Sequence, residues 1–304
     1  MELGNKSNIF GKIFSSQSDR GNYTSANGYQ NYFISYIGVN DEDIYNSEIY
    51  NLNREINNRK NICLFKQNIL NPDDFDIISY LKNKVSKYNG SIFDLDIDLV
   101  KYEDINNRIK RGFDILLRQE EKSFNNDRVK FNFIIKVMSW IRIYINPLVI
   151  DYKDAPKVVV YGDIKKHELY FLLILYFAGF DILYINPNGL SEIANIDAKK
   201  FNIEINQNKI IDETISFDER VERGEIVERS SIKKAYTGRV TISLSKLNPG
   251  LNFRGSFQYI STSSTVELKS RVFIFLFWSC HGFINPESFN NSSLIFLDAC
   301  APTV

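Results

Sequence analysis

The segment from Lys157 to Pro187, KVVVYGDIKKHELYFLLILYFAGFDILYINP, constrains the fold of this chain more than any other feature. It opens with a β-branched run, Val158 to Val160, and closes with a second apolar run, Asp181 to Ile185. Between them, Lys165 to Ala178 favour a helix that Gly179 is suited to end. A strand, a helix and a strand within about 30 residues form a βαβ unit. Because neither strand alternates with polar residues, the sequence predicts an α/β fold with a Rossmann-like βαβ unit and parallel strands.

Polar and small residues follow both predicted strands, at the ends where ligands bind to open parallel sheets. Such ligands lie outside the carboxyl ends of the strands, beside helix N-termini whose free N–H groups attract negative charge. The candidate ligand-binding residues at these ends are Tyr161, Gly162, Asp163, Glu168, Asn186 and Asn188. The alternatives are that Asp163 only caps the helix and that Glu168 and His167 lie on the surface. Neither G-x-G-x-x-G after the first strand nor G-x-x-x-x-G-K-[ST] occurs, so the sequence identifies no cofactor.

Three alternating carboxylates, Asp94, Asp96 and Asp98, also invite a binding role, because calcium and magnesium take oxygen ligands. An EF-hand loop beginning at Asp94 would need glycine and glutamate where Leu99 and Ile105 stand, so that motif fails. The alternation with apolar residues favours instead a strand with one solvated face, and no metal site is predicted. No G-x-S-x-G or H-E-x-x-H motif occurs either, so the catalytic residues, and whether the chain is an enzyme, stay open.

The part of the chain before the βαβ unit combines strands and helices. Strands are predicted at Asn31–Gly38 and Asn61–Lys66, and a helix follows the start signal Asn71–Asp74. Helical periodicity returns from about Glu103 to Glu121 and from Asp127 to Ile145. We therefore expect four regions: a disordered tail at 1–30, an N-terminal α+β and helical domain at 31–150, the Rossmann-like domain at 151–236, and an atypical tail at 237–304.

Composition and charge exclude several classes of protein. The chain has 304 residues, 44% of them hydrophobic, and 37 basic against 37 acidic side chains, so it carries no general attraction to nucleic acid or anionic lipid. Its three cysteines form no C-x-x-C pair, which indicates a reducing compartment. Residues 1–30 lack the apolar core of a secretory signal. The apolar run Leu169–Ala178 has the length of a core helix, so we expect a cytoplasmic protein without membrane insertion.

The βαβ segment and the upstream strand NYFISYIGV resemble the YceG-type family of bacterial tellurite-resistance and envelope-stress gene clusters. The resemblance extends from Asn31 to about Tyr236, and it is carried by Tyr161 to Asp163, Glu168, Phe171, Gly179, Asp181, Tyr184, Asn186 and Pro187. It implies a cytoplasmic accessory of a stress operon. Such a protein would be a component of a biosynthetic module that makes or modifies a small metabolite, with other proteins of the operon as partners.

The C-terminal part departs from that family. The chain is short for such proteins, and the residues after about Thr237 do not look like the family's continuation. These features predict a truncation or a reading-frame shift near that position. Just before it, a charged helix is expected from Asp218 to Lys234, broken near Gly224.

Two classes of function follow from these patterns. The first is a biosynthetic enzyme or binding protein that holds a nucleotide- or sugar-like ligand around Gly162, Asp163, Asn186 and Asn188. The second is a non-catalytic adaptor for other stress-operon proteins, in which the same residues only cap helices. A third reading, attachment to a membrane through the apolar helix, would show as partition into detergent.

Overall fold

The computed structural model has an α/β fold with a five-stranded, all-parallel sheet of strand order β2-β3-β4-β1-β5 in the part of the chain that it describes. That part comprises residues 10–15, 20, 30–124, 126–150, 154–189, 192–210, 214–236, 239–243 and 254–258. The strands are β1 Phe33–Ile37, β2 Ile62–Phe65, β3 Lys157–Tyr161, β4 Asp181–Asn186 and β5 Glu204–Gln207. The predicted parallel βαβ unit is therefore confirmed, as β3 and β4 pair directly.

Six α-helices are described alongside the sheet: α1 Glu42–Asn57, α2 Phe75–Val85, α3 Glu103–Gln119, α4 Asp127–Trp140, α5 Lys166–Phe177 and α6 Phe217–Tyr236. Several begin where the sequence supplies a capping oxygen. Asp41, Asp74 and Asn126 accept hydrogen bonds from backbone N–H groups in the first turns of α1, α2 and α4, which satisfies donors that a helix leaves unpaired. Shorter helices are η1 Gly11–Phe14, η3 Glu121–Ser123, η4 Ile141–Ile145 and η5 Glu192–Asn195.

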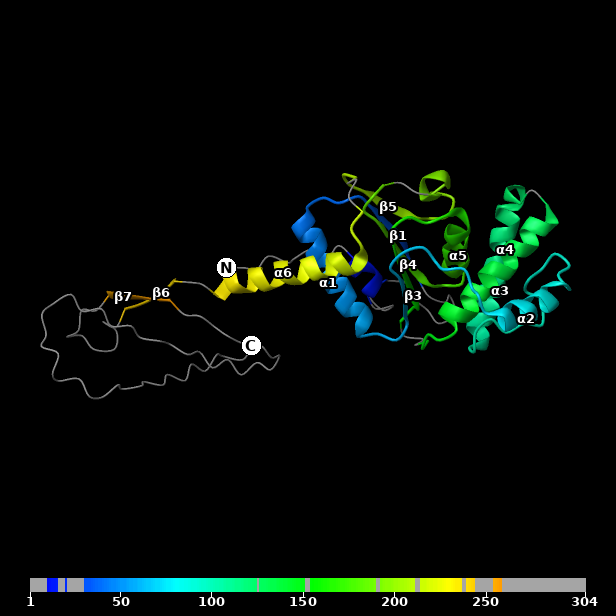
Figure 1. Cartoon of the computed structure of the whole chain (residues 1–304), viewed down its shortest axis with the longest axis horizontal. Coiled ribbons are helices and arrows are strands. Elements are labelled where there is room, and N and C mark those ends of the chain that lie inside the picture. The colour runs from blue at the N-terminus through cyan, green and yellow to red at the C-terminus, as the bar shows by residue number, and fades with distance from the viewer. Residues whose placement is uncertain are drawn as a thin grey trace, which may run out of the picture. The chain divides into compact units, whose positions relative to one another are not determined.

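The helices cover both faces of the sheet (Figure 1). On one face α1 packs with the alternate strand residues Val159, Leu183 and Ile185. On the other face α5 lies directly against the sheet, and α3 and α4 pack beyond it in one continuous core that includes Val160 and Ile182. This two-sided burial explains why β3 and β4 lack polar alternation.

The apolar segment of α5 is a core helix, as its length predicts. Its residues from Leu169 to Leu175 are buried, and Gly112 of α3 allows that helix to approach it closely. A Cβ at Gly112 would lie 2.5 Å from the carbonyl oxygen of Ile174. In the described part of the chain, no helix is both long and apolar enough to cross a membrane.

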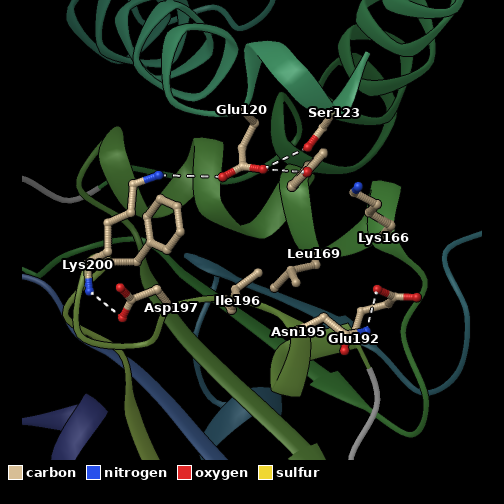
Figure 2. A pocket seen from close by; sticks show the side chains of 11 residues that line it. Glu120, Ser123, Lys166, Leu169, Glu192, Asn195, Ile196, Asp197 and Lys200 are labelled. Atoms are coloured by element: carbon tan, nitrogen blue, oxygen red, sulfur yellow. Dashed lines mark hydrogen bonds and ion pairs between the residues drawn. The ribbon is translucent and has the colours of Figure 1, made fainter. Parts of the chain in front are cut away.

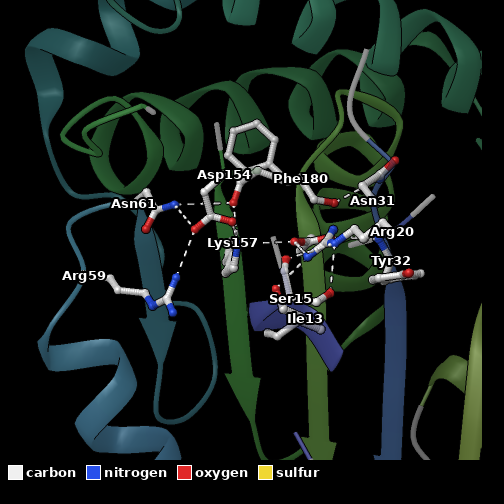
Figure 3. Close-up of polar contacts among 12 residues, drawn as sticks. Ile13, Ser15, Arg20, Asn31, Tyr32, Arg59, Asn61, Asp154, Lys157 and Phe180 are labelled. Atoms are coloured by element: carbon white, nitrogen blue, oxygen red, sulfur yellow. Dashed lines mark hydrogen bonds and ion pairs between the residues drawn. The ribbon is translucent and has the colours of Figure 1, made fainter. Parts of the chain in front are cut away.

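The expectation of a disordered tail over residues 1–30 does not hold for the residues described there. Phe10 and Ile13 are buried against the α1 face of the sheet. Arg20 donates to both carboxylate oxygens of Asp181, at 2.7 and 2.9 Å. Lys157 lies 3.4 Å from the same carboxylate, and all three charged side chains are fully buried. This network, part of which Figure 3 shows, fastens the N-terminal segment to the amino edge of the sheet.

The expected boundary between residues 150 and 151 does not separate two sheets. β1 pairs with β4, and β2 pairs with β3, so strands from both expected domains alternate in a single sheet. Residues 1–227 accordingly form one compact unit. The physical reason is that a parallel strand pairs with whichever buried strand the crossover helix brings beside it, regardless of separation in sequence.

Helix α6 is continuous through Gly224, where the sequence suggested a break. The glycine instead permits close packing, because an added Cβ would lie 2.0 Å from the carbonyl oxygen of Asn46 in α1. One turn earlier, the buried Arg220 donates to the side-chain oxygen of Asn46 at 2.8 Å and to the Tyr161 hydroxyl at 3.0 Å. Glycine and arginine together dock the start of α6 on α1 and β3.

Two other expectations concern segments outside the regular core. The predicted strand around Asp94, Asp96 and Asp98 is absent, because residues 91–100 form turns and loop. This loop nevertheless buries the apolar side chains of Ile92, Leu95, Ile97 and Leu99. The alternation in the sequence therefore comes from a loop that covers the core. Beyond Tyr236, the described residues form only the antiparallel pair β6 Arg239–Ser243 and β7 Arg254–Gln258, and the expectation of a truncation near Thr237 lies outside the described residues.

Candidate functional site at the carboxyl edge of the sheet

The carboxyl edge of the sheet has a topological switch point between β4 and β1. After β1 the chain enters α1 on one face. After β4 it enters η5 on the other face, where Ile193 and Phe201 pack in the same core as α5. Open parallel sheets bind ligands where adjacent strands lead to opposite faces. The strand ends here are joined by a hydrogen bond of 2.8 Å from the Gly38 N–H to the Asn186 carbonyl oxygen.

Glycine is required at position 38. Its φ is +78°, and a Cβ would lie 2.6 Å from the carbonyl oxygen of Lys209. The loops that follow β1 and β5 therefore run in contact at this edge, and the Val39 N–H donates to the same Lys209 oxygen at 2.7 Å.

The structure brings together two of the predicted site residues, Asp163 and Asn186. The Asn186 amide donates to the Asp163 carboxylate at 2.9 Å and to the Tyr184 hydroxyl at 3.0 Å, and its oxygen accepts from the Asn188 N–H at 3.0 Å. Asn186 is buried, whereas Asp163 is exposed. The side-chain oxygen of Asn188 is buried and accepts no hydrogen bond from any described residue.

The other predicted residues occupy separate positions. Gly162 has a φ of +94° with open space around it, so conformation rather than crowding favours glycine there. The Tyr161 side chain lies on the opposite face, where its hydroxyl donates to the Ile215 carbonyl oxygen at 2.8 Å. Glu168 is buried and accepts from the Ile69 N–H at 2.7 Å and the Lys165 N–H at 2.6 Å. Glu168 thereby holds the loop after β2 against the start of α5.

Four basic side chains gather at the N-terminus of α5, beside the end of β3. We call Lys136, Lys165, Lys166 and His167 the basic cluster. Lys136 comes from α4, and the others come from the N-cap and first turn of α5. None of the three lysines forms an ion pair with another side chain in the described ranges.

The pKa values of two of these groups reflect their crowding. Burial lowers the pKa of His167, and the charges of Lys136 and Lys166 lower it further, while Glu168 opposes the shift. Burial also lowers the pKa of Lys136, whose ammonium lies 4.7 Å from the centroid of the Trp140 ring. A bound anion would offset the repulsion between these groups and so raise both pKa values.

Lys136, Lys165, Lys166 and Gly38 are not among the candidate site residues that the sequence predicts. Lys136 sits between Ile135 and Val137 in an apolar helix, and only the packing of α4 on α5 brings it to the α5 N-terminus. A lysine within an apolar stripe is the one signal that could have indicated its role. The sequence indicates Gly38 only as the end of a strand, because its contact with Lys209 depends on the order of the strands.

Comparisons with known proteins relate most of the chain to one family. A family model described as YceG domain matches residues 4–237. A segment of 48 residues is 44% identical to the "Uncharacterized protein YceG" of Bacillus subtilis (strain 168) and covers 16% of this chain. That segment spans only 9% of the length of the relative. No solved structure matches the chain.

Proposed function

The chain belongs to the YceG domain family, and on that premise we propose that it binds a small phosphorylated ligand, of nucleotide or sugar type, at the carboxyl edge of its sheet. The observation that supports this most is the basic cluster at the N-terminus of α5. The first N–H groups of a helix have no intrahelical partner and carry a partial positive charge, so the basic cluster and the helix N-terminus both attract anions. Phosphate oxygens fit both.

The basic cluster is not a by-product of a general excess of basic residues. Lys+Arg and Asp+Glu are equal at 37 each over the whole chain, so unpaired lysines on neighbouring elements are a local feature. Within the proposed site, the lysines bind phosphate, and Gly162 lets the chain turn beside it. Asp163 and Asn186 hold the two strand ends together, Glu168 positions the α5 N-terminus, and the Asn188 oxygen accepts from a ligand donor.

The wider role that we propose comes from the family resemblance. In it the protein is a cytoplasmic component of a biosynthetic module in tellurite-resistance or envelope-stress clusters, and the ligand is a substrate or product of that module. A non-catalytic adaptor is the second candidate. It is favoured by the exposed apolar side chains of Leu70, in the loop after β2, and Phe75, the first residue of α2, which are 64% and 77% accessible.

Removing the charges at the α5 N-terminus is expected to weaken phosphate binding. The double substitution Lys165→Ala and Lys166→Ala should raise the Kd for pyrophosphate about tenfold or more, because each charge-assisted hydrogen bond contributes about 1.5–3 kcal/mol. Titration calorimetry measures the change, with Lys60→Ala as the matched control because Lys60 precedes β2 at the amino edge of the sheet. Equal Kd values for all three proteins would contradict the proposed site.

Binding of phosphate should also raise the pKa of His167. In the free protein the pKa lies below the ordinary value, so the folded state favours neutral imidazole, and stability is lost as pH falls through the unfolded value of about 6.5. A nearby phosphate reverses the repulsion from Lys136 and Lys166. NMR titration with and without pyrophosphate measures the shift, and His167→Gln distinguishes this residue from His281. If the pKa of His167 were the same with and without pyrophosphate, His167 would not lie beside the bound anion.

The same titrations separate the two candidate functions. A cooperatively folded protein whose melting temperature and heat of mixing do not respond to pyrophosphate, nucleotides or sugar phosphates would favour the adaptor, because binding to the native state raises its apparent stability.

A further inference from the structure

A cavity of about 340 Å³ opens beside the basic cluster, between α5 and the segment that follows η5 (Figure 2). Its walls include Glu120, Lys166, Tyr170, Glu192 and Lys200. These residues come from the end of α3, from the start of α5, and from η5 and the turn after it. The cavity is thus built by elements on the same face of the sheet as α5.

Lys166 belongs both to the cavity wall and to the basic cluster. It opens α5, and its ammonium lies 5.5 Å from the centroid of the Tyr170 ring, one turn further along the helix. A ligand held by Lys166 at the helix N-terminus therefore has adjoining space along α5 for the rest of its structure.

The cavity wall is rich in hydrogen-bond acceptors. One oxygen of Glu120 accepts from the Tyr170 hydroxyl and from the Ser123 hydroxyl, both at 2.9 Å, and its other oxygen lies 3.6 Å from the Lys200 ammonium. Burial above all, with a contribution from Glu120, raises the pKa of Tyr170 to about 12, so its hydroxyl stays protonated and donates.

Glu192 has more acceptor capacity to spare. A carboxylate offers about four lone-pair positions, and the only described donor to Glu192 is the Asn195 amide, at 3.2 Å, which reaches one oxygen. Glu192 lines the same cavity as Tyr170, and its charge contributes to the raised pKa of that tyrosine. Leu169, Ile196 and Phe201 supply apolar surface between these polar groups.

We propose that this cavity holds the hydroxyl-bearing ring of a sugar phosphate whose phosphate group is bound by the basic cluster. This inference rests on the proposed function and specifies its substrate class. Sugar hydroxyls donate to Glu120 and Glu192 and accept from Lys200, while the C–H surface of the ring packs on Leu169 and Ile196. The cavity volume lies at the lower end of the ~300–1,000 Å³ typical of ligand pockets, which suits one sugar ring.

Titration calorimetry on the full chain with ribose 5-phosphate, glucose 6-phosphate and inorganic phosphate tests this assignment. We expect both sugar phosphates to bind at least about tenfold more tightly than inorganic phosphate, because the ring adds hydrogen bonds to charged groups. Glu192→Gln should weaken sugar-phosphate binding about tenfold and leave inorganic phosphate unaffected. Glu222→Gln, on the exposed side of α6, is the matched control and should change neither affinity.

The results distinguish the two proposals. Sugar phosphates that bind no more tightly than inorganic phosphate, or that bind Glu192→Gln unchanged, would overturn the sugar site and leave the phosphate site standing. Tighter binding of spermidine than of either sugar phosphate would also overturn it, since the carboxylates would then serve a polyamine. If no phosphate compound binds to the folded protein, the proposed function fails and the sugar site with it.

Discussion

Replacing Asp181 with alanine is expected to lower the free energy of unfolding by about 3–5 kcal/mol, because it leaves the buried Arg20 without its counter-charge, whereas Lys157 keeps its ion pair with Asp154. Asp181 opens β4 and is fully buried. It accepts from two nitrogens of Arg20 and, at 2.9 Å, from the Tyr32 N–H, and it faces the buried ammonium of Lys157. Burial raises the pKa of this carboxyl, and the two cations oppose that shift.

Urea unfolding followed by circular dichroism measures the loss, which is a large fraction of the ~5–15 kcal/mol that stabilises a typical domain. The control is Asp218→Ala, which removes an ion pair with Lys66 whose two side chains are 65% and 47% exposed. Exposed ion pairs contribute little to stability, so the control should unfold at nearly the same urea concentration as the unaltered protein. If the urea midpoint of Asp181→Ala were as close to that of the unaltered protein as the control's, Arg20 would have to find another partner for its charge.

Replacing Gly224 with alanine is expected to detach the start of α6 from α1. The new Cβ would lie 2.0 Å from the carbonyl oxygen of Asn46 and 2.8 Å from the Cβ of Tyr50, and backbone cannot yield as a flexible side chain can. Overpacking costs about 1–3 kcal/mol, and a clash with backbone belongs to the upper part of that range, above the ~1 kcal/mol that alanine gains over glycine in a helix. The hydrogen bonds from Arg220 to Asn46 and Tyr161 would be lost with the docking.

Hydrogen exchange of residues 217–227, together with urea unfolding, measures this effect. Glu222→Ala is the matched control, because it places the same residue, alanine, at an exposed position of the same helix. Faster exchange in Gly224→Ala and unchanged exchange in the control are expected. Equal protection in both variants would mean that the α1–α6 contact is not held by this close approach.

Local patterns were sufficient to predict the centre of the sheet and part of the candidate site. The uniform apolar character of β3 and β4 and the helix between them follow directly from Lys157 to Pro187, because a βαβ unit is a local structure. Parallel strands end at the same edge, so the meeting of Asp163 with Asn186 was predictable as well. Glu168 was identified too, although the structure gives it two backbone partners rather than an open position.

Other features depend on contacts between residues that are distant in sequence. Arg20 reaches Asp181 across 161 positions, and no local pattern marks an arginine in a polar segment as the partner of a buried carboxylate. Lys136 joins the basic cluster only because α4 packs beside α5. From the sequence alone, Gly224 is expected to break a helix. Its role in close packing depends on the backbone of α1, which lies against it in the structure.

The sequence by itself determined the α/β class, the parallel βαβ unit and the polar strand ends, because each depends on the periodicity or composition of a short segment. Only the tertiary structure decided that β1 lies between β4 and β5, that the N-terminal segment is fastened by a buried ion pair, and that a cavity adjoins the basic cluster. The reason is physical: strand order, buried charge pairs and cavities are set by which surfaces meet, and those contacts join residues that local propensity leaves independent.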